Sequence, residues 1–246
     1  MDRTVLTLAR SRRLTRDVYE LVLEGDASAF TRPGQFAELA LPGKFLRRPI
    51  SAANFAPGGL LLLVRAAGAG TEALVRSAPG TRFDALTGLG NGFDAAAGGA
   101  SPVLIGGGIG LAPLYGLARA LTAGGIVPAA ALGFRTAEDV FYAEDFAALG
   151  CRVFVATEDG SLGTKGFVTD LVRRFLPECD YAFACGPTAM LRAAAGLEQL
   201  RGGQFSLEAR MGCGFGACMG CTVETKSGPR RVCADGPVFR KEELTW

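Results

Sequence analysis

The sequence predicts an α/β plus β protein with an N-terminal antiparallel β-barrel, a parallel α/β domain and a small cysteine-rich C-terminal segment. Short strand-like runs separated by Pro-Gly pairs fill roughly the first 95 residues. Strands and helices alternate in the middle of the chain, as in parallel α/β sheets. Beyond residue 202 the periodicity fades and cysteine and glycine become frequent. We therefore expect domains at residues 1–97, 98–202 and 203–246.

Composition excludes several classes of protein. Of the 246 residues, 49% are hydrophobic, which is enough for a core and excludes a disordered chain. The formal net charge is only +2, so nucleic acid is not an expected partner. The chain contains no histidine, which excludes a Ser-His-Asp or Cys-His nucleophile, a histidine general base and a histidine-ligated zinc ion.

Cysteine usage and the N-terminal sequence indicate a compartment. The chain has seven cysteines, an odd number, and Met1-Asp2-Arg3-Thr4 leads into a strand without an apolar signal core. We expect a reducing, cytoplasmic setting with free thiols or a metal site. The uncharged stretch 95–118 is interrupted by several glycines and prolines, so we do not expect it to enter a membrane.

The barrel strands are predicted from apolar runs of strand length. They are Thr4–Leu8, Val18–Leu23, Gln35–Leu41, Arg48–Ser51 and Leu60–Arg65. A short helix is expected at Thr71–Ser77, with Thr71 as its N-cap and Glu72 in its first turn. Short strands at this spacing favour a small antiparallel barrel.

The middle of the chain changes to a helical period. Strands are predicted at Val103–Ile105, Ala129–Phe134, Arg152–Ala156 and Tyr181–Ala184. Helical stripes of apolar residues fall within 114–121, 168–175 and 190–197, and Pro113 suits the first turn of the first helix.

The strongest chemical signal is a run of cysteines near the C-terminus. Cys213, Cys218 and Cys221 follow the spacing C-x4-C-x2-C, with Cys233 as a distal fourth member. This is the plant-type ligand spacing of a [2Fe–2S] cluster, and thiolates suit iron–sulfur chemistry. Structural zinc is the alternative, although zinc usually takes paired short spacings. The remaining cysteines, 151, 179 and 185, show no ligand spacing, and we expect the first two to be core or surface filler.

Two glycine-containing loops follow predicted strands. Gly106, Gly107, Gly108 and Gly110 lie between a strand and a helix, where free amides and the helix dipole favour a phosphate. The loop departs from G-x-G-x-x-G, so a plain strand-to-helix turn is the alternative. Cys185-Gly186-Pro187 follows another strand, and we expect it beside the first loop at the carboxyl edge of the sheet.

A third group of candidate residues lies in the barrel. It comprises Arg48, Pro49, Ile50 and Ser51, then Leu63, Val64 and Arg65, and finally Gly70 and Thr71. An arginine held on a strand can neutralise a pyrophosphate, and a helix N-terminus also favours phosphate. The alternative is an edge strand with a solvated arginine.

The order of these motifs resembles one family over nearly the whole chain. The chain is similar to the electron-transfer subunits of type B, NAD-dependent dihydroorotate dehydrogenase, within the ferredoxin-reductase-like superfamily. The resemblance is carried by Arg47–Ser51, Gly68–Thr71, Gly88–Phe93, Gly106–Gly110, Asp139–Tyr142, Thr157–Ser161, Cys185–Pro187, Glu208–Cys213 and Val232–Phe239. The last two motifs are the most specific, because the wider superfamily lacks them. The gap between Cys221 and Cys233 is short for the family.

The resemblance implies cofactors and their residues. FAD would bind in the barrel through the nine residues named above, from Arg48 to Thr71. The cluster ligands would be Cys213, Cys218, Cys221 and Cys233. The nucleotide-binding domain would bind NAD at the two glycine loops, with Cys185 near the nicotinamide and without an acid–base role. Hydride and electron exchange need position and proximity rather than a protein acid or base, which agrees with the absence of histidine.

The resemblance also implies a partner. An FMN-containing catalytic subunit would oxidise dihydroorotate in pyrimidine biosynthesis, and electrons would pass from FMN through the cluster and FAD to NAD⁺. A heterotetramer of two plus two subunits is expected, with neither nucleic acid nor membrane as a partner. Phe215 and Met219 beside the cluster ligands would line the docking face, or would simply shield the cluster.

Three other functions stay open at the level of sequence. One is the small subunit of a ferredoxin:NADP oxidoreductase or sulfide dehydrogenase, in which we expect Asp in place of Cys213. Another is a self-contained NAD(P)H:acceptor reductase, and the third is a redox sensor, which would not need two nucleotide sites. The choice between NAD and NADP is also open, since Arg135 favours a 2′-phosphate whereas Glu138 and Asp139 oppose it.

Overall fold

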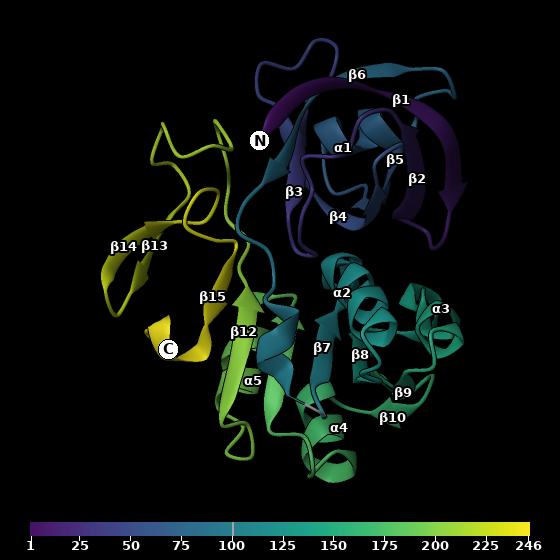
Figure 1. Ribbon diagram of the computed structural model, residues 1–246. Coiled ribbons are helices and arrows are strands. Elements are labelled where there is room, and N and C mark those ends of the chain that lie inside the picture. The colour runs from purple at the N-terminus through teal and green to yellow at the C-terminus, as the bar shows by residue number, and fades with distance from the viewer. Residues whose placement is uncertain (100) are drawn as a thin grey trace.

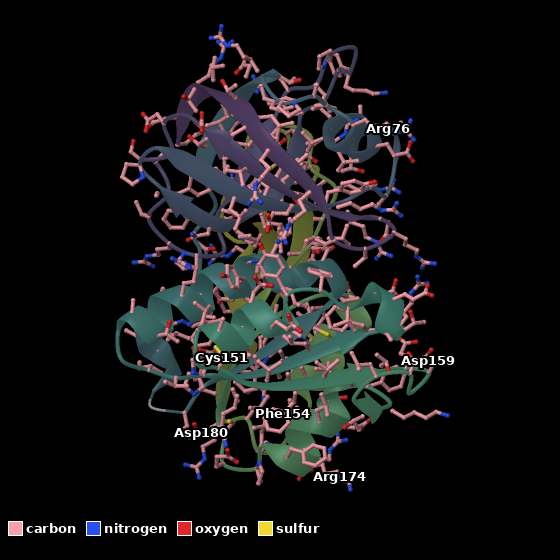
Figure 2. All side chains as sticks on the ribbon, turned by 90° about the vertical axis from the view of Figure 1, so that its right-hand side faces the viewer. Arg76, Cys151, Phe154, Asp159, Arg174 and Asp180 are labelled. Atoms are coloured by element: carbon pink, nitrogen blue, oxygen red, sulfur yellow. The ribbon has the colours of Figure 1, made fainter. Side chains whose placement is uncertain are left out.

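The computed structural model describes residues 1–99 and 101–246. Figure 1 shows the barrel above, the α/β domain below it and the cysteine-rich segment along one flank of both. Figure 2 shows the same stacking from the side, with Arg76 on the barrel and Asp159 at the outer edge of the α/β domain. None of the described helices combines the length and apolar character that crossing a membrane requires.

The barrel is closed by six antiparallel strands in the order β1-β2-β5-β4-β3-β6. The strands are β1 (Asp2–Arg13), β2 (Val18–Glu24), β3 (Phe36–Leu39), β4 (Arg48–Ala56), β5 (Gly59–Arg65) and β6 (Arg82–Leu89). The predicted barrel is thus confirmed. Strand β6 was not predicted, although Phe83, Ala85 and Thr87 alternate into the buried face.

The short helix α1 (Ala69–Val75) begins earlier than predicted. Its N-cap is Gly68, so the prediction that Thr71 is the N-cap is wrong. The Thr71 hydroxyl lies one turn inside the helix and accepts hydrogen bonds from the backbone amides of Ala67 and Gly68. Thr71 therefore stabilises the helix start by reaching back to it, as the third helical residue does in a capping box.

The α/β domain is built on a seven-stranded sheet in the order β10-β9-β8-β7-β11-β12-β15. Its strands are β7 (Val103–Gly107), β8 (Ala129–Phe134), β9 (Arg152–Thr157), β10 (Thr164–Lys165), β11 (Tyr181–Cys185), β12 (Gly202–Ser206) and β15 (Val238–Arg240). All neighbours are parallel except β12 and β15. The predicted parallel sheet is confirmed, with one antiparallel strand added at its edge.

Helices cover both faces of this sheet. They are α2 (Leu111–Ala123), α3 (Ala143–Ala148), α4 (Val168–Phe175) and α5 (Thr188–Ala195). Buried residues of α2 and α3 share one apolar cluster, and those of α4 and α5 share another. Cys151 and Cys179 are buried, and burial raises the pKa of each thiol to about 11, so the expectation of core cysteines is confirmed.

The cysteine-rich region is joined to the sheet at two places. Strands β12 and β15 belong to the seven-stranded sheet, and a hairpin of β13 (Thr222–Thr225) and β14 (Gly228–Arg231) lies between them in sequence. The Asn91 amide, in the loop after β6, donates to the Val238 carbonyl at 2.7 Å and accepts from the Val238 amide at 3.1 Å. The domain boundaries stay a prediction, but the segment after residue 202 does not fold apart from the sheet.

The barrel and the α/β domain share apolar packing. Val18, Ala53 and Leu63 of the barrel belong to the same buried cluster as the residues of α2. A methyl group on Gly116 of α2 would lie 2.8 Å from the carbonyl oxygen of Ala53. The two bodies are therefore in close contact along α2.

Candidate functional site

The four predicted cluster ligands converge as two pairs. The sulfur atoms of Cys221 and Cys233 lie 3.2 Å apart, and both residues are only 2% exposed. Cys213 is half-buried and Cys218 is exposed. The amides of Ala217 and Cys218 donate to the Cys213 sulfur at 3.2 and 3.4 Å, which wraps the loop around that sulfur.

The loop that carries Cys213 and Cys218 depends on glycine. Gly214 and Gly216 have φ angles of +78° and +92°, which side chains other than glycine rarely adopt. Gly216 is anchored from the neighbouring hairpin, because Arg231 Nη1 donates to its carbonyl at 3.0 Å. Arg231 is held by Asp235 through Nε and Nη2 at 3.0 and 3.2 Å.

The chemistry of this loop fits a binuclear cluster. Partial burial alone would raise the pKa of Cys213, but hydrogen bonds from the backbone amides of Cys218 and Phe215 lower it to about 6. A thiol with such a pKa is a ready thiolate ligand. No three described histidine, cysteine or acidic side chains converge on one point as a single metal ion would require. The spacing of these ligands, with Cys233 as a lone distal member, is typical of a [2Fe–2S] cluster, whereas zinc usually takes two short-spaced pairs.

A buried carboxylate lies beside the cluster loop. Glu38 on β3 is fully buried, and neither of its side-chain oxygens has a hydrogen-bond partner in the described chain. Burial raises the pKa of Glu38 to about 7, against the opposing effect of Arg47. A methyl group on Gly214 would lie 2.5 Å from Cγ of Glu38, so the cluster loop rests directly on the barrel.

The barrel candidates gather at one end of β4. A side chain on Gly70 would overlap the guanidinium of Arg48, so Arg48 lies against the first turn of α1. Its Nη1 donates to the carbonyl oxygens of Leu46 and Arg47 at 2.6 and 3.1 Å. Within the described chain, Nε and Nη2 of Arg48 have no acceptor, which leaves two donors for an anion.

The other barrel candidates differ in exposure. Pro49, Ile50 and Ser51 are half-buried along β4. Leu63 and Val64 are buried, so only their backbone can face a ligand. Arg65 Nε is paired with Asp17 at 2.7 Å.

The two glycine loops meet, as the sequence predicts. Cys185 of β11 pairs in register with Gly106 of β7. A side chain on Gly110 would overlap the Cys185 carbonyl, so only glycine allows this contact. Helix α2 begins directly after Gly110, and its first amides lie at the loop.

Cys185 itself is a buried, neutral thiol. It is 3% exposed, and burial followed by the charge of Glu208 raises its pKa to about 12. A group with this pKa neither gives nor takes a proton near neutral pH. The absence of an acid–base role for Cys185 is consistent with this.

A cavity of about 430 Å³ opens at the carboxyl edge of the sheet. Asp17, Val18 and Arg65 of the barrel form one wall. The opposite wall includes Gly107, Gly108, Ile109, Gly133, Phe134, Arg135, Asp139, Phe141, Glu158, Gly166, Phe167, Val168, Thr169, Pro187, Ala189, Met190 and Ala193. Its position outside the carboxyl ends of β7, β8, β9 and β11 is where open α/β sheets bind nucleotides.

Comparison with known proteins decides the family. A Shouchella clausii protein named dihydroorotate dehydrogenase B (NAD(+)), electron transfer subunit, is 43% identical over 97% of this chain and 96% of its own length. The chain belongs to this family. The Bacillus caldolyticus electron transfer subunit is 42% identical over 99% of both chains. Two family models also match: the iron-sulfur cluster binding domain of dihydroorotate dehydrogenase B at residues 208–245 and the oxidoreductase NAD-binding domain at residues 104–196.

Solved structures agree with the fold of this electron transfer subunit family. A chain of an NADH-dependent reduced ferredoxin-NADP oxidoreductase superposes with a TM-score of 0.88 at 30% identity, covering 98% of this chain and 90% of that one. A cytochrome P450 reductase from Amycolatopsis gives a TM-score of 0.71 at 28% identity, covering 81% and 67%. The ferredoxin-reductase-like fold expected from the sequence is confirmed.

The structure assembles the predicted residues into three places within this electron transfer subunit. The cysteines form one, the end of β4 with Gly70 forms the second, and the paired glycine loops form the third. Arg65 lies in the cavity with Gly107, Gly108 and Pro187, and Arg48 does not. That these residues bind the cofactors stays a prediction.

Sequence reasoning missed three acidic residues near these places. Asp17 lines the cavity, Glu38 rests on the cluster loop and Glu20 is buried at the domain junction. A signal existed for Glu38, because it interrupts the apolar run Phe36–Leu39 inside a strand. Glu20 and Asp17 give no such signal, since charged residues on an alternating strand or in the turn before it usually face solvent.

Proposed function

We propose that this chain is the electron-transfer subunit of an NAD-dependent dihydroorotate dehydrogenase, carrying electrons from an FMN-containing catalytic subunit to NAD⁺. The observation that supports this most is the convergence of Cys213, Cys218, Cys221 and Cys233 as two thiol pairs. The named relatives over the full length give the class of substrate.

The cysteine pairs would hold a [2Fe–2S] cluster. Cys221 and Cys233 would ligate the buried iron, and Cys213 and Cys218 the iron nearer the surface. The amides of Ala217 and Cys218, which already point at sulfur, would stabilise thiolate charge in the holoprotein. Arg231 would hold the loop in place from the hairpin.

The end of β4 would hold FAD, which converts between paired and single electrons when bound. Arg48 would balance the pyrophosphate with its two unused donors, aided by the α1 N-terminus beside it. Ser51 and its half-buried neighbours on β4 would contact the flavin from the barrel side. The contact between Gly214 and Glu38 supports a short path from the cluster loop to this barrel.

The cavity would bind the dinucleotide, and its charges favour NAD over NADP. Arg135 is the cation placed to meet a 2′-phosphate, but Asp139 lies 3.6 Å from its Nε. Glu158 adds a carboxylate to the same wall, suited to a ribose hydroxyl and repelling a phosphate. Phe167, 65% exposed at the rim, offers a face for the adenine ring.

The catalytic subunit would dock over the cluster. Phe215 and Met219 are 49% and 54% exposed beside the ligands. Phe45 and Leu46 are also exposed, in the loop between β3 and β4. Arg47, the next residue, donates a hydrogen bond to the carbonyl of Glu38. Because Glu38 touches the cluster loop at Gly214, the loop between β3 and β4 lies beside the cluster loop. We also propose that two copies of this chain and two catalytic subunits form a heterotetramer in the cytoplasm.

Anaerobic co-expression with an FMN-containing dihydroorotate dehydrogenase tests the proposal. We expect a brown complex with flavin and iron–sulfur absorbance and dihydroorotate-dependent reduction of NAD⁺. A colourless or zinc-loaded preparation would contradict it. Full activity of this chain alone toward ferredoxin would instead favour a self-contained reductase.

Cys218→Ser separates the cofactors. We expect this variant to lose the cluster while keeping FAD and NADH-to-dye activity, because Cys218 is exposed and is not among the residues proposed to hold FAD. Cys151→Ser, a buried cysteine outside the ligand set, is the matched control and should keep its iron. Joint loss of FAD and cluster in Cys218→Ser would contradict separate sites.

A further inference from the structure

A buried hydrogen bond joins the barrel to the α/β domain. The hydroxyl of Tyr142, just before α3, donates to Oε2 of Glu20 on β2 at 2.7 Å. Tyr142 and Glu20 are 6% and 5% exposed. The two residues are separated by 122 positions, so the bond spans the domain junction rather than a local turn.

The acceptor carboxylate is fully engaged. Arg12 donates to both oxygens of Glu20, through Nε at 3.2 Å and Nη2 at 2.9 Å, and Arg10 donates to Oε1 at 3.1 Å. Burial alone would raise the pKa of Glu20, but hydrogen bonds from Arg12 and Tyr142 hold it below its usual value. Tyr142 therefore donates to a buried anion, which is a strong hydrogen bond.

The backbone of Tyr142 is in a strained conformation. Its φ angle is +63°, and among the described residues only Met219 shares a positive φ without being glycine. A bulky residue at a positive φ is strained, so contacts with its surroundings must stabilise this conformation. Such a contact is visible, since the Tyr142 ring packs edge-on against Tyr115 of α2 at 4.8 Å between ring centres.

The strained segment is also a wall of the cavity. Asp139 and Phe141, immediately before Tyr142, line it from the α/β side. Asp17 and Val18 line it from the barrel side, where neighbouring Arg16 lies 3.6 Å from Asp139. The bond between Tyr142 and Glu20 thus lies where the two walls join.

We propose that Tyr142 is a positioning residue, which through Glu20 holds the two walls at the separation that hydride transfer between dinucleotide and flavin requires. This rests on the proposed function, in which the cavity holds the dinucleotide and the barrel holds FAD. Tyr142 takes no part in the transfer, in which one hydride carries both electrons between the two rings. Small errors in donor–acceptor distance are costly, since misplacement by 1 Å can slow a reaction about 100-fold.

The test compares two hydroxyl deletions in the cofactor-loaded protein. Tyr142→Phe removes the bond to Glu20 and keeps the ring. Tyr115→Phe is the matched control, because its ring packs in the same aromatic group and its hydroxyl has no partner in the described chain. With iron and FAD contents unchanged, we expect NADH to reduce the flavin about tenfold more slowly in Tyr142→Phe and at an unaltered rate in Tyr115→Phe.

A second readout does not depend on activity. Hydrogen exchange of the amides of residues 139–149 should be faster in Tyr142→Phe than in the parent protein and unchanged in Tyr115→Phe. In a Glu20→Gln background, Tyr142→Phe should have a smaller effect on amide exchange and on the rate of flavin reduction than it has in the parent protein. The reason is that both substitutions weaken the same contact.

The outcomes separate the two proposals. Parent-like exchange and flavin reduction in Tyr142→Phe, or strictly additive effects with Glu20→Gln, would overturn the positioning role and leave the proposed function standing. Failure of NADH to reduce the flavin of the parent protein would overturn the proposed function itself.

Discussion

Single glycines decide how closely functional groups approach one another in this chain. Gly70 lets Arg48 lie on the first turn of α1, and Gly110 lets the two nucleotide-domain loops meet. In both places the missing Cβ matters more than backbone freedom, since neither residue has a positive φ. The positions of Arg48 and of the loop at Cys185 thus depend on neighbouring residues that have no side chain.

Gly70→Ala should weaken FAD binding. The added methyl group would overlap the Arg48 guanidinium and move it away from the proposed pyrophosphate position. Because hydrogen bonds to a charged group contribute about 1.5–3 kcal/mol, we expect the FAD dissociation constant to rise at least tenfold. Titration of the deflavinated protein with FAD measures it.

The control for this substitution is Gly68→Ala. Gly68 lies at the same helix start, and a methyl group there meets nothing within 4 Å. Its φ of 178° is extended backbone that alanine also adopts. Equal weakening by both substitutions would show that α1, rather than Arg48, is responsible.

At the scale of elements, the loop after β6 fastens the cysteine-rich segment. Besides the side-chain bonds of Asn91, its backbone amide donates to the Gly236 carbonyl at 2.7 Å. Gly90 supports the same contact, because a methyl group there would lie 2.5 Å from Pro237. The motif Gly88–Phe93 is therefore a fastening for the segment that carries Cys233.

Asn91→Ala should loosen this segment. Loss of the two hydrogen bonds to Val238 should lower the stability of this segment by about 1–2 kcal/mol, a value reduced because Asn91 is exposed. Iron release to a chelator should then be up to tenfold faster, since 1.4 kcal/mol corresponds to a factor of ten. Asn54→Ala on β4 is the control, and an unchanged release rate in Asn91→Ala would contradict the fastening.

The elements themselves were largely predictable, and their contacts were not. Helix 168–175 follows from an apolar period of about 3.6 residues, and strand Ala129–Phe134 follows from a short continuous apolar run, because a central parallel strand is buried on both faces. The N-cap of α1 predicted from the sequence, Thr71, is three residues later than the observed N-cap, Gly68, because a glycine N-cap gives no side-chain signal. The cysteine spacing predicted which four cysteines lie together as two pairs. The contact between Glu20 and Tyr142 could not be predicted, since it depends on how the barrel and the α/β domain pack against each other.

At the scale of the whole molecule, α2 packs against both the α/β sheet and the barrel. Its apolar residues pack under the sheet, and Gly116 rests on the barrel at Ala53. The Tyr142–Glu20 bond lies on the same side, through Tyr115 of this helix. The two nucleotide-binding bodies are therefore joined by packing as well as by hydrogen bonding.

Gly116→Ala should force the bodies apart. Helix propensity alone predicts a gain of about 1 kcal/mol for this change. The methyl group would instead press on the Ala53 carbonyl at 2.8 Å, which is closer than real contacts of this kind. We expect a lower melting temperature and slower reduction of the flavin by NADH, measured by calorimetry and stopped-flow absorbance.

Gly124→Ala, at the C-cap of the same helix, is the control for adding a methyl group to this helix without the contact to Ala53. A methyl group there lies 3.3 Å or more from its neighbours, all within α2. If Gly116→Ala were more stable than the parent protein and its flavin were reduced at the parent rate, the junction would accommodate the methyl group and the prediction would be wrong.

Strand β15 has a consequence for how the polypeptide is made. Strand β12 pairs with β11 on one side and with Val238–Arg240 on the other, so its outer edge is bare until those late residues leave the ribosome. A bare edge is a template for association with other chains. Synthesis from the N-terminus thus leaves the outer edge of β12 open to association until Val238–Arg240 have emerged, and chaperone demand should be highest in that interval.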